Sequence, residues 1–343
     1  MQANEQDENI KIKMEARDKK FTGLALSCGS AGGYGQLGAL HYFYSETDSM
    51  KDCKYFAGAS VGAAVGCLLA IGFTPIEVFA ELCTNDINEF LEINFNLMNL
   101  INSWGMVENH KFLEYIERLI KKRLGFIPTF RELFEMNGNT LITVSYCLSK
   151  NQPCYFNYQT QPDMPISVGV WLSCNIPILF DKAEYNGEVY IDGAVFDRCP
   201  AYFLKNYIRD EVKTDEFNVM VIDLFSPHQE KRNDIKRFVD YVAKVGFVVL
   251  ECQKKPKSDD QLEVIVVENE FGDFTLNVEK SARLRAFTTC FNATKQKYGK
   301  SQRKSLLEVS PEVEEEKENS EKTEKSAGDE VVVKNIIDKE KVD

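Results

Sequence analysis

Short apolar runs alternate with stretches of helical periodicity along the middle of the chain, and glycine, proline and asparagine separate them. Four apolar runs predict strands, at residues 21–27, 54–57, 141–148 and 217–224. Apolar spacing predicts helices over 35–44, 61–72, 87–104 and 234–252, and another helix that opens at Pro75. Strands interleaved with helices predict an α/β fold with a central, mostly parallel sheet and helices on both faces.

Composition separates two charged ends from this body. Residues 1–20 carry charges of both signs and are expected to form a charged arm. Residues 301–343 contain 13 acidic and 8 basic side chains and no aromatic residue, so we expect a disordered or weakly helical acidic tail. The segment 21–300 is expected to be one domain, since the run 217–224 has the composition of a further buried strand.

Charge and cysteine usage restrict the classes of function. The 343 residues carry a formal charge of −12, which argues against a nucleic-acid partner because phosphate contacts need clustered Lys and Arg. The ten cysteines form no CxxC pair and no zinc-type cluster, so they predict free thiols in a reducing compartment and no metal site. The amino-terminal residues lack an apolar signal region, and no long uncharged apolar stretch follows. We therefore expect a cytoplasmic protein with peripheral membrane contact at most.

The most specific chemical signal is the sequence Gly58-Ala59-Ser60-Val61-Gly62, a GxSxG motif between a predicted strand and a helix of small residues. In such a turn the serine hydroxyl is exposed, and the two glycines let neighbouring backbone come close. The amino terminus of the following helix favours negative charge that develops beside the serine. The alternative is a glycine-rich turn in which Ser60 only caps the helix.

Two further motifs flank this one. Upstream, residues 28–35 read Cys-Gly-Ser-Ala-Gly-Gly-Tyr-Gly, a loop between strand and helix that is suited to presenting backbone N–H groups to a phosphate or an oxyanion. The loop contains no lysine that could reach a phosphate. Downstream, Asp192-Gly193-Ala194 follows a short apolar run, although an Asp-Gly pair alone can be merely a turn.

Taken together, the three motifs resemble those of the patatin-like phospholipase family, and the resemblance covers about residues 21–205. That family combines a glycine-rich oxyanion loop, GxSxG and DG[GA], which correspond here to residues 28–33, 58–62 and 192–194. Residues 171–180, Trp-Leu-Ser-Cys-Asn-Ile-Pro-Ile-Leu-Phe, are similar to the family stretch Ala-Ser-x-x-x-Pro-x-x-Phe.

The resemblance implies a three-layer patatin-like fold and hydrolysis of fatty-acyl esters, most of all those of glycerophospholipids. It makes Ser60 the nucleophile and Asp192 the general base, in a dyad without histidine. The oxyanion loop would comprise Gly29, Ser30, Ala31, Gly32 and Gly33. Neither a cofactor nor a metal is implied. The expected partners are an acyl-lipid substrate, a membrane surface contacted transiently and an unknown protein activator.

One departure from the family pattern keeps other functions open. The family loop usually reads Gly-Gly-Gly-x-Arg/Lys-Gly, whereas this chain has Cys28 and Ser30 at two glycine positions and Gly32 at the basic position. Backbone N–H donors survive these changes, but the positive charge near the oxyanion does not. A catalytically silent lipid-binding protein on the same fold is therefore one alternative. An acyltransferase that passes the acyl group to an acceptor other than water is another.

Histidine and an amphipathic segment leave two more alternatives. The order Ser60, Asp192, His228 matches the triad order of α/β-hydrolases, but Ser60 follows only the second predicted strand. His41 and His110 are expected to be structural or at the surface. Residues 87–104 are expected either to pack on the core or to form a lid or interfacial helix. The cations at 121–123 end a predicted helix, where they suit its dipole and could also touch lipid head groups.

Overall fold

The computed structural model describes residues 19–84, 102–226, 238–271, 275 and 278–299. The predicted arm 1–20, except its last two residues, the tail 301–343 and most of the predicted helix 87–104 lie outside the described residues. The strands are β1 (Gly23–Leu26), β2 (Tyr55–Ala59), β3 (Gly105–Val107), β4 (Thr140–Cys147), β5 (Gln152–Phe156), β6 (Ile178–Phe180), β7 (Ala183–Tyr185), β8 (Glu188–Asp192), β9 (Val219–Phe225) and β10 (Leu262–Glu268).

Helices and two short 3-10 turns connect these strands. The helices are α2 (Gly33–Ser45), α3 (Val61–Ala70), α4 (Pro75–Thr84), α6 (Asn109–Leu124), α7 (Phe130–Asn137), α8 (Ile166–Ser173), α9 (Ala201–Val212), α10 (Phe238–Glu251) and α11 (Lys280–Tyr298). The 3-10 turns are η1 (Ser30–Gly32) and η3 (Gly193–Val195).

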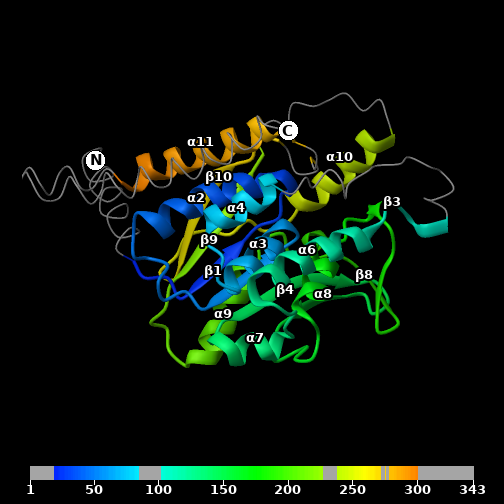
Figure 1. Cartoon of the computed structure of the whole chain (residues 1–343), viewed down its shortest axis with the longest axis horizontal. Helices are drawn as coiled ribbons and strands as arrows, with labels where there is room; N and C mark the ends of the chain where they lie inside the picture. The colour runs from blue at the N-terminus through cyan, green and yellow to red at the C-terminus, as the bar shows by residue number, and fades with distance from the viewer. Residues whose placement is uncertain (1–18, 85–101, 227–237, 272–274, 276–277, 300–343) are drawn as a thin grey trace, which may run out of the picture.

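The central sheet is mixed, with a parallel centre, as the sequence predicts. Its strand order is β10-β9-β1-β2-β4-β8-β7, and β5 pairs with β4 beside this path. The five strands from β10 to β4 are parallel, whereas β5, β7 and β8 pair antiparallel to their neighbours. The carboxyl ends of the parallel strands therefore point to one end of the molecule, on the right in Figure 1. A separate small sheet joins β3 and β6 in parallel.

Three strands, β2, β5 and β8, pair with the two edges of β4. This pairing decides where the ends of β2 and β8 meet. β5 pairs with β4 over the stretch that pairs first with β2 and then with β8, so β2 and β8 must lie on the same edge, opposite β5. Ala59 of β2 is opposite Val144, and Asp192 of β8 is opposite the next residue, Ser145. The carboxyl ends of β2 and β8 thus meet end to end.

Alternate residues of the central strands pack on opposite faces of the sheet. Leu24 and Leu26 of β1 join the larger core under α2, α3, α4, α6, α8 and α11, whereas Ala25 joins the smaller core under α9. Helices thus cover both faces of the sheet, which completes the three-layer α/β architecture (Figure 1). β9 and β10 extend the same sheet beyond β1.

The observed elements differ from the predicted ones mainly at their ends. The strand predicted over 54–57 continues to Ala59, because Gly58 is paired on both sides, with Leu26 and with Thr143. The helix predicted over 35–44 begins earlier, at Gly33, where the η1 turn runs directly into it. Such shifts are common, because apolar spacing marks the middle of an element better than its ends.

The ten cysteines are free thiols, as predicted. Most are buried among apolar side chains, where burial raises the pKa of the Cys53 and Cys67 thiols to about 12. In the described ranges, no single helix has the length and apolar character to cross a membrane. Only the sharply bent pair of α3 and α4 meets that test jointly.

Two helical glycines provide a paired test of the packing. A Cβ on Gly38 would lie 2.1 Å from the Phe287 carbonyl oxygen, where α2 crosses α11, whereas a Cβ on Gly66 would meet only side-chain atoms at 3.9 Å. We expect Gly38→Ala to lower the free energy of unfolding by about 1–3 kcal/mol through overpacking. Gly66→Ala should raise it by roughly 0.5–1 kcal/mol, because alanine loses less entropy in a helix. Urea unfolding measures both, and a neutral Gly38→Ala would contradict the close crossing.

Candidate active site

Ser60 occupies a strained turn between β2 and α3. Its φ is 55° and its ψ is −127°, a conformation that non-glycine residues rarely adopt and that costs about 1–3 kcal/mol. A helix-capping serine would accept a side-chain hydrogen bond at the start of α3, and the Ser60 side chain makes no such bond. The Ser60 residue is 6% exposed, and its side chain lines a pocket. The turn therefore presents the hydroxyl instead of using it to cap the helix.

The two glycines of this turn allow backbone to approach backbone. A Cβ on Gly62 would lie 2.4 Å from the Leu26 carbonyl oxygen, and a Cβ on Gly58 would lie 2.2 Å from backbone atoms of Gly62. Any larger residue would push the first turn of α3 away from β1 and β2. The motif is thus a packing requirement that places Ser60 at the carboxyl end of the sheet.

Asp192 ends β8 beside this turn. Its carboxylate accepts a hydrogen bond of 2.8 Å from the Ala194 N–H, and the Ser60 hydroxyl lies near enough to favour its anion. Its own N–H donates to the Asn175 carbonyl oxygen at 2.8 Å. A Cβ at Gly193 would lie 2.2 Å from the Val144 carbonyl oxygen, so only glycine lets the chain turn away here. The structure thus brings together the two side chains that the sequence resemblance named as a dyad.

Burial controls the protonation of Asp192. The residue is 4% exposed, and loss of water raises the pKa of its carboxyl group to about 7. The hydrogen bonds from Ala194 and Ser60 oppose this rise because they favour the anion. A carboxyl group with a pKa near neutrality can both accept and return a proton, which is what a general base in acyl transfer needs.

The segment 171–180, for which the sequence predicts no role, contacts both Ser60 and Asp192. The Ser173 Oγ accepts a hydrogen bond of 3.1 Å from the Ser60 N–H. The Ser145 hydroxyl lies within hydrogen-bond distance of the Leu172 and Ile191 carbonyl oxygens, at 3.1 and 3.0 Å. With the bond from Asp192 to Asn175, these contacts tie both members of the dyad to the carboxyl end of α8. No local pattern could reveal contacts that span so much sequence.

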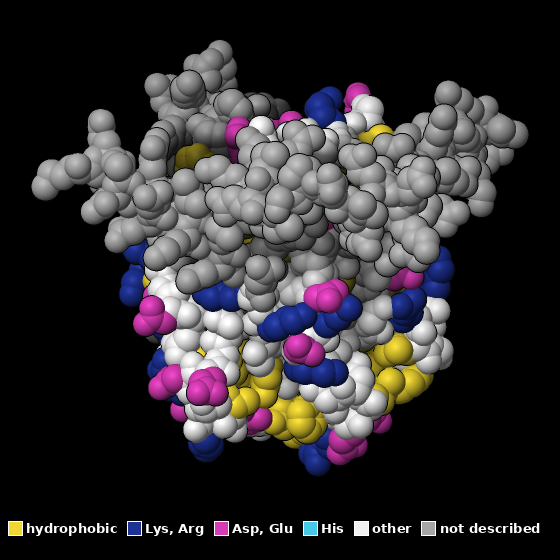
Figure 2. Space-filling model, turned by 90° about the vertical axis from the view of Figure 1, so that its left-hand side faces the viewer, with side chains coloured by type: hydrophobic (Ala, Val, Ile, Leu, Met, Phe, Trp, Pro, Cys, Tyr) yellow, Lys and Arg dark blue, Asp and Glu magenta, His cyan; other side chains and the backbone are white. Residues whose placement is uncertain are grey.

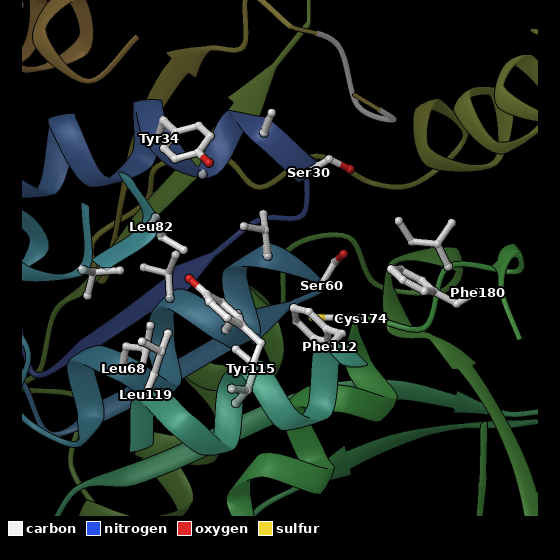
Figure 3. A pocket seen from close by; sticks show the side chains of 18 residues that line it. Ser30, Tyr34, Ser60, Leu68, Leu82, Phe112, Tyr115, Leu119, Cys174 and Phe180 are labelled. Carbon is white, nitrogen blue, oxygen red and sulfur yellow. The ribbon is translucent and has the colours of Figure 1, made fainter. Parts of the chain in front are cut away.

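The glycine-rich loop lies across the pocket from Ser60, with Ser30, Ala31 and Gly33 among the lining residues (Figure 3). Three of its five N–H groups already donate to carbonyl oxygens. Ala31 donates to Thr275 at 3.0 Å, Gly32 donates to Gly29 at 2.8 Å, and Gly33 donates within the η1 turn. An oxyanion hole at this loop would therefore begin at Gly29 rather than use all five residues.

The structure also explains why the loop lacks a basic side chain. A Cβ on Gly32 would lie 2.8 Å from Asn269 Cγ and from Leu224 Cδ1, so a larger side chain there would require these neighbours to shift. Behind the loop, the buried Arg198 donates to the Asp223 carboxylate at 2.9 Å and to the Leu224 carbonyl oxygen at 2.6 Å. Its own carbonyl oxygen accepts the Cys28 N–H. A paired guanidinium residue thus supports the start of the loop through the Cys28 N–H.

An apolar pocket extends from the dyad into the core. It holds about 860 Å³ of empty space, counting its open mouth. In Figure 3, Ser60 and Phe180 lie at one end, and Leu68, Leu82 and Leu119 lie toward the other. The walls come from α2, α3, α4 and α6, and most of the side chains that face the space are aliphatic or aromatic. The pocket therefore suits an extended hydrocarbon group whose polar end remains at Ser60.

The histidines do not provide a base within the described residues. His41 is buried between the rings of Phe287 and Phe291, with centroid separations of 5.6 and 5.3 Å. His110 is on the surface near Glu108, and His228 lies outside the described residues. The cations at 121–123 form the last turn of α6. Nowhere in the described ranges do three or more His, Cys, Asp or Glu side chains gather as metal ligands.

Comparison with known proteins gives a family match, two viral relatives and a similar solved structure. A family model described as patatin-like phospholipase matches residues 24–205. The chain is 30% identical, over 65% of its length and 77% of the relative's, to a probable lipid hydrolase of Invertebrate iridescent virus 6. It is 23% identical, over 81% of its length and 94% of the relative's, to an uncharacterized protein of Acanthamoeba polyphaga mimivirus. The crystal structure of VipD from Legionella pneumophila superposes with a TM-score of 0.45 and 17% identity, covering 82% of this chain and 67% of that one.

The hydrogen bond from Ser60 to Ser173 can be tested directly. Ser173→Ala would leave the buried Ser60 N–H without an acceptor, so we expect a loss of about 1–3 kcal/mol in the free energy of unfolding. The turn should also relax, and labelling of Ser60 by a fluorophosphonate should slow. Ser173→Thr keeps the hydroxyl and should restore much of the labelling rate. Ser167→Ala, at a buried position on the same helix, is the matched control. Equal labelling of Ser173→Ala and the parent protein would contradict the positioning role.

Proposed function

This chain belongs to the patatin-like phospholipase family of lipid hydrolases, and from that premise we propose that it cleaves fatty-acyl esters of glycerophospholipids through a Ser60–Asp192 dyad. The observation that carries the proposal is the closeness of the Ser60 hydroxyl to the buried Asp192 carboxylate, at one end of an apolar pocket. The name of the viral relative, a probable lipid hydrolase, supports the same reaction class.

The first half of the reaction forms an acyl-enzyme. Asp192 takes the proton of the Ser60 hydroxyl, and Ser60 Oγ attacks the ester carbonyl carbon. The carbonyl oxygen becomes an oxyanion in the tetrahedral intermediate. As the intermediate collapses, the bond from carbon to the leaving oxygen breaks, and Asp192 returns the proton to the departing alcohol, a lysophospholipid. The acyl group is left on Ser60.

The second half releases the fatty acid. A water molecule enters beside Asp192, gives its proton to the carboxylate and attacks the acyl carbon. The second tetrahedral intermediate collapses, Ser60 Oγ leaves and recovers the proton from Asp192, and the fatty acid departs. One carboxyl group thus serves as base and then as acid in each half. A pKa near neutrality suits this double use, because neither protonation state is strongly favoured.

Stabilisation of the oxyanion is assigned to the beginning of the glycine-rich loop and to the amino terminus of α3. In the loop, the N–H group of Gly29 is the proposed donor, because the N–H groups of Ala31, Gly32 and Gly33 already donate to carbonyl oxygens. α3 begins directly after Ser60, so its positive end lies beside the attacked carbonyl. A single donor in such a site typically contributes about 10²–10³ in rate, so correct loop placement matters as much as the base.

Substitution of either dyad residue tests the proposal. We expect Ser60→Ala and Asp192→Asn each to lower fatty-acid release from mixed phospholipid vesicles by more than about 10³, because the first loses the nucleophile and the second its base. His110→Ala, at a surface histidine, should change the rate little and serves as the control. Release is measured by extraction and quantification of the free fatty acid.

The outcomes separate the alternatives. Release that persists in Ser60→Ala would show that Ser60 is not the nucleophile. A large loss in His228→Ala would favour a triad over the dyad. If the parent protein releases nothing, labelling by a lipid-analogue fluorophosphonate decides between a competent site that needs an activator and a catalytically silent one. Transfer of the acyl group to an added alcohol would indicate an acyltransferase.

The pH dependence follows from burial of Asp192. Only the ionised carboxylate can act as base, so we expect the rate to rise with pH and to level off above an apparent pKa near 7. Because folding raises this pKa above the ordinary value of 3.8, the stabilising contribution of the neutral carboxyl is complete below about pH 4. It is lost as pH rises through about 7.

The contribution lost amounts to roughly 4 kcal/mol. Asp192→Asn cannot ionise. Between pH 4 and 8 the free energy of unfolding of the parent protein should therefore fall relative to that of the variant. Unfolding measured across this range, together with the pH–rate profile, checks both statements. A profile that is flat down to pH 5 would contradict the raised pKa.

A further inference from the structure

Helix α10 presents an apolar stripe to solvent. Tyr241, Val245, Val248 and Val249 are 56, 47, 51 and 39% exposed, and they follow one another at spacings of four, three and one residues. These spacings place the four side chains on one face of the helix. Single exposed apolar residues are ordinary on protein surfaces, but a continuous stripe on one helix indicates a binding surface.

The other side of α10 is fastened to the candidate active site. Leu250 is buried against Cys28, at the start of the glycine-rich loop, and against Ala194, next to Asp192. Just after the helix, the Gln253 side chain donates to the Ala194 carbonyl oxygen at 2.6 Å and accepts the Arg198 N–H at 2.7 Å. A surface that engages the exposed face of α10 is therefore held at a set position relative to the dyad.

More exposed apolar residues lie around this end of the molecule. Phe196 follows the η3 turn that α10 contacts, Phe225 ends β9, and the two are 50 and 42% exposed. Trp104 is 59% exposed and directly precedes β3, whose partner β6 contributes Phe180 to the pocket. α10 and β3 lie at the same end in Figure 1, the end to which the parallel strands point. Apolar groups thus lie near the end of the pocket that holds Ser60 and Phe180.

Lysines accompany these apolar groups. Lys255 Nζ lies 5.6 Å from the Phe225 ring centroid, Lys254 Nζ lies 4.5 Å from that of Tyr202, and Lys182 Nζ lies 5.1 Å from that of Trp104. Residues 253–257 read Gln-Lys-Lys-Pro-Lys, three cations without a carboxylate, in a chain whose formal charge is −12. Over residues 238–257, four lysines outnumber one Asp and one Glu. This segment therefore carries a net positive charge, whereas the whole chain carries a net negative charge.

We propose that α10 is an interfacial helix that docks the protein on an anionic phospholipid bilayer, with Phe196, Phe225 and Trp104 beside it. The inference rests on the proposed function, since it says how the site meets a lipid substrate. Aliphatic and aromatic side chains enter the boundary between head groups and acyl chains, and the lysines meet lipid phosphates. Docking places the pocket mouth against the bilayer, so an acyl chain moves from lipid to pocket without crossing water.

The distribution of charge favours a bilayer over a protein partner at this end. In the part of the opposite end that Figure 2 shows in colour, acidic and basic side chains intermix between separate apolar patches. The α10 end instead combines an apolar stripe with lysines next to aromatic rings, the pairing found where proteins meet head groups. A surface with both properties is complementary to anionic lipid.

The test measures binding apart from catalysis, in a Ser60→Ala background that leaves the vesicles intact. Binding to vesicles of phosphatidylcholine with phosphatidylserine is followed by cosedimentation. We expect Val245→Ser with Val248→Ser to weaken binding by about 5- to 10-fold, because apolar area that enters the interface is lost. The matched control is Met136→Ser with Val212→Ser, which changes exposed apolar residues of α7 and α9, at 48 and 38%, and should bind like the parent.

The charge contribution is tested separately. Lys254→Gln with Lys255→Gln should weaken binding to phosphatidylserine-containing vesicles by about 10- to 30-fold and leave binding to pure phosphatidylcholine unchanged. Added salt should reduce this difference, because the lysines act through screened attraction. In the catalytic protein, the valine and lysine pairs should lose vesicle hydrolysis in proportion to binding. Hydrolysis of a water-soluble short-chain ester should not change.

Three results would overturn the docking proposal while leaving the proposed function standing. The first is unchanged vesicle binding in both double variants. The second is equal binding to neutral and anionic vesicles. The third is a parent protein that is dimeric by light scattering and becomes monomeric in the valine variant without loss of vesicle binding, since the stripe would then join two copies. Failure of the proposed function would instead appear as absent hydrolysis of the soluble ester, whatever the binding.

Discussion

A carboxyl group removed from water can carry a charge only where hydrogen bonds replace its lost hydration. Asp192 is in this position. The Ala194 N–H and the Ser60 hydroxyl both favour its anion, yet burial still raises the pKa of the carboxyl group to about 7. The proposed role of Asp192 as a base depends on this balance, because full exposure would leave too weak a base and complete isolation would keep it protonated. The surrounding backbone serves mainly to hold these few bonds.

The balance is possible because two strands meet end to end. β2 and β8 share one edge of β4, so Ala59 and Asp192 lie opposite successive residues, Val144 and Ser145. The strained turn then holds the Ser60 hydroxyl close to the Asp192 carboxylate. The end of α8 fixes both sides of this junction, through Ser173 to one side and through the Asn175 carbonyl to the other. A shift of either strand by one residue would separate the dyad, since alternate side chains face opposite sides of a sheet.

The same end of the sheet concentrates everything that a lipid would encounter. The carboxyl ends of parallel strands converge there, so the loops that follow β1 and β2 form the glycine-rich loop and the serine turn (Figure 1). The apolar pocket extends from this point into the core between α3 and α6. Gln253, just after α10, donates a hydrogen bond to the carbonyl oxygen of Ala194, two residues after Asp192. The proposed chemistry, acyl binding and bilayer contact would thereby be coupled through one small region of backbone.

Local sequence alone determined the strands near 141–148 and 217–224, because mostly apolar runs of this length are stable only when buried. It also located the turn at Ser60, because glycines two residues to either side are needed wherever α3 packs this closely on the sheet. Only the tertiary structure decided that β8 approaches β2 along β4 and that Ser173 supports the serine turn. It alone showed that three N–H groups of the loop are already engaged. These contacts join segments far apart in the chain, and no local pattern records which distant backbone atom will meet a given side chain.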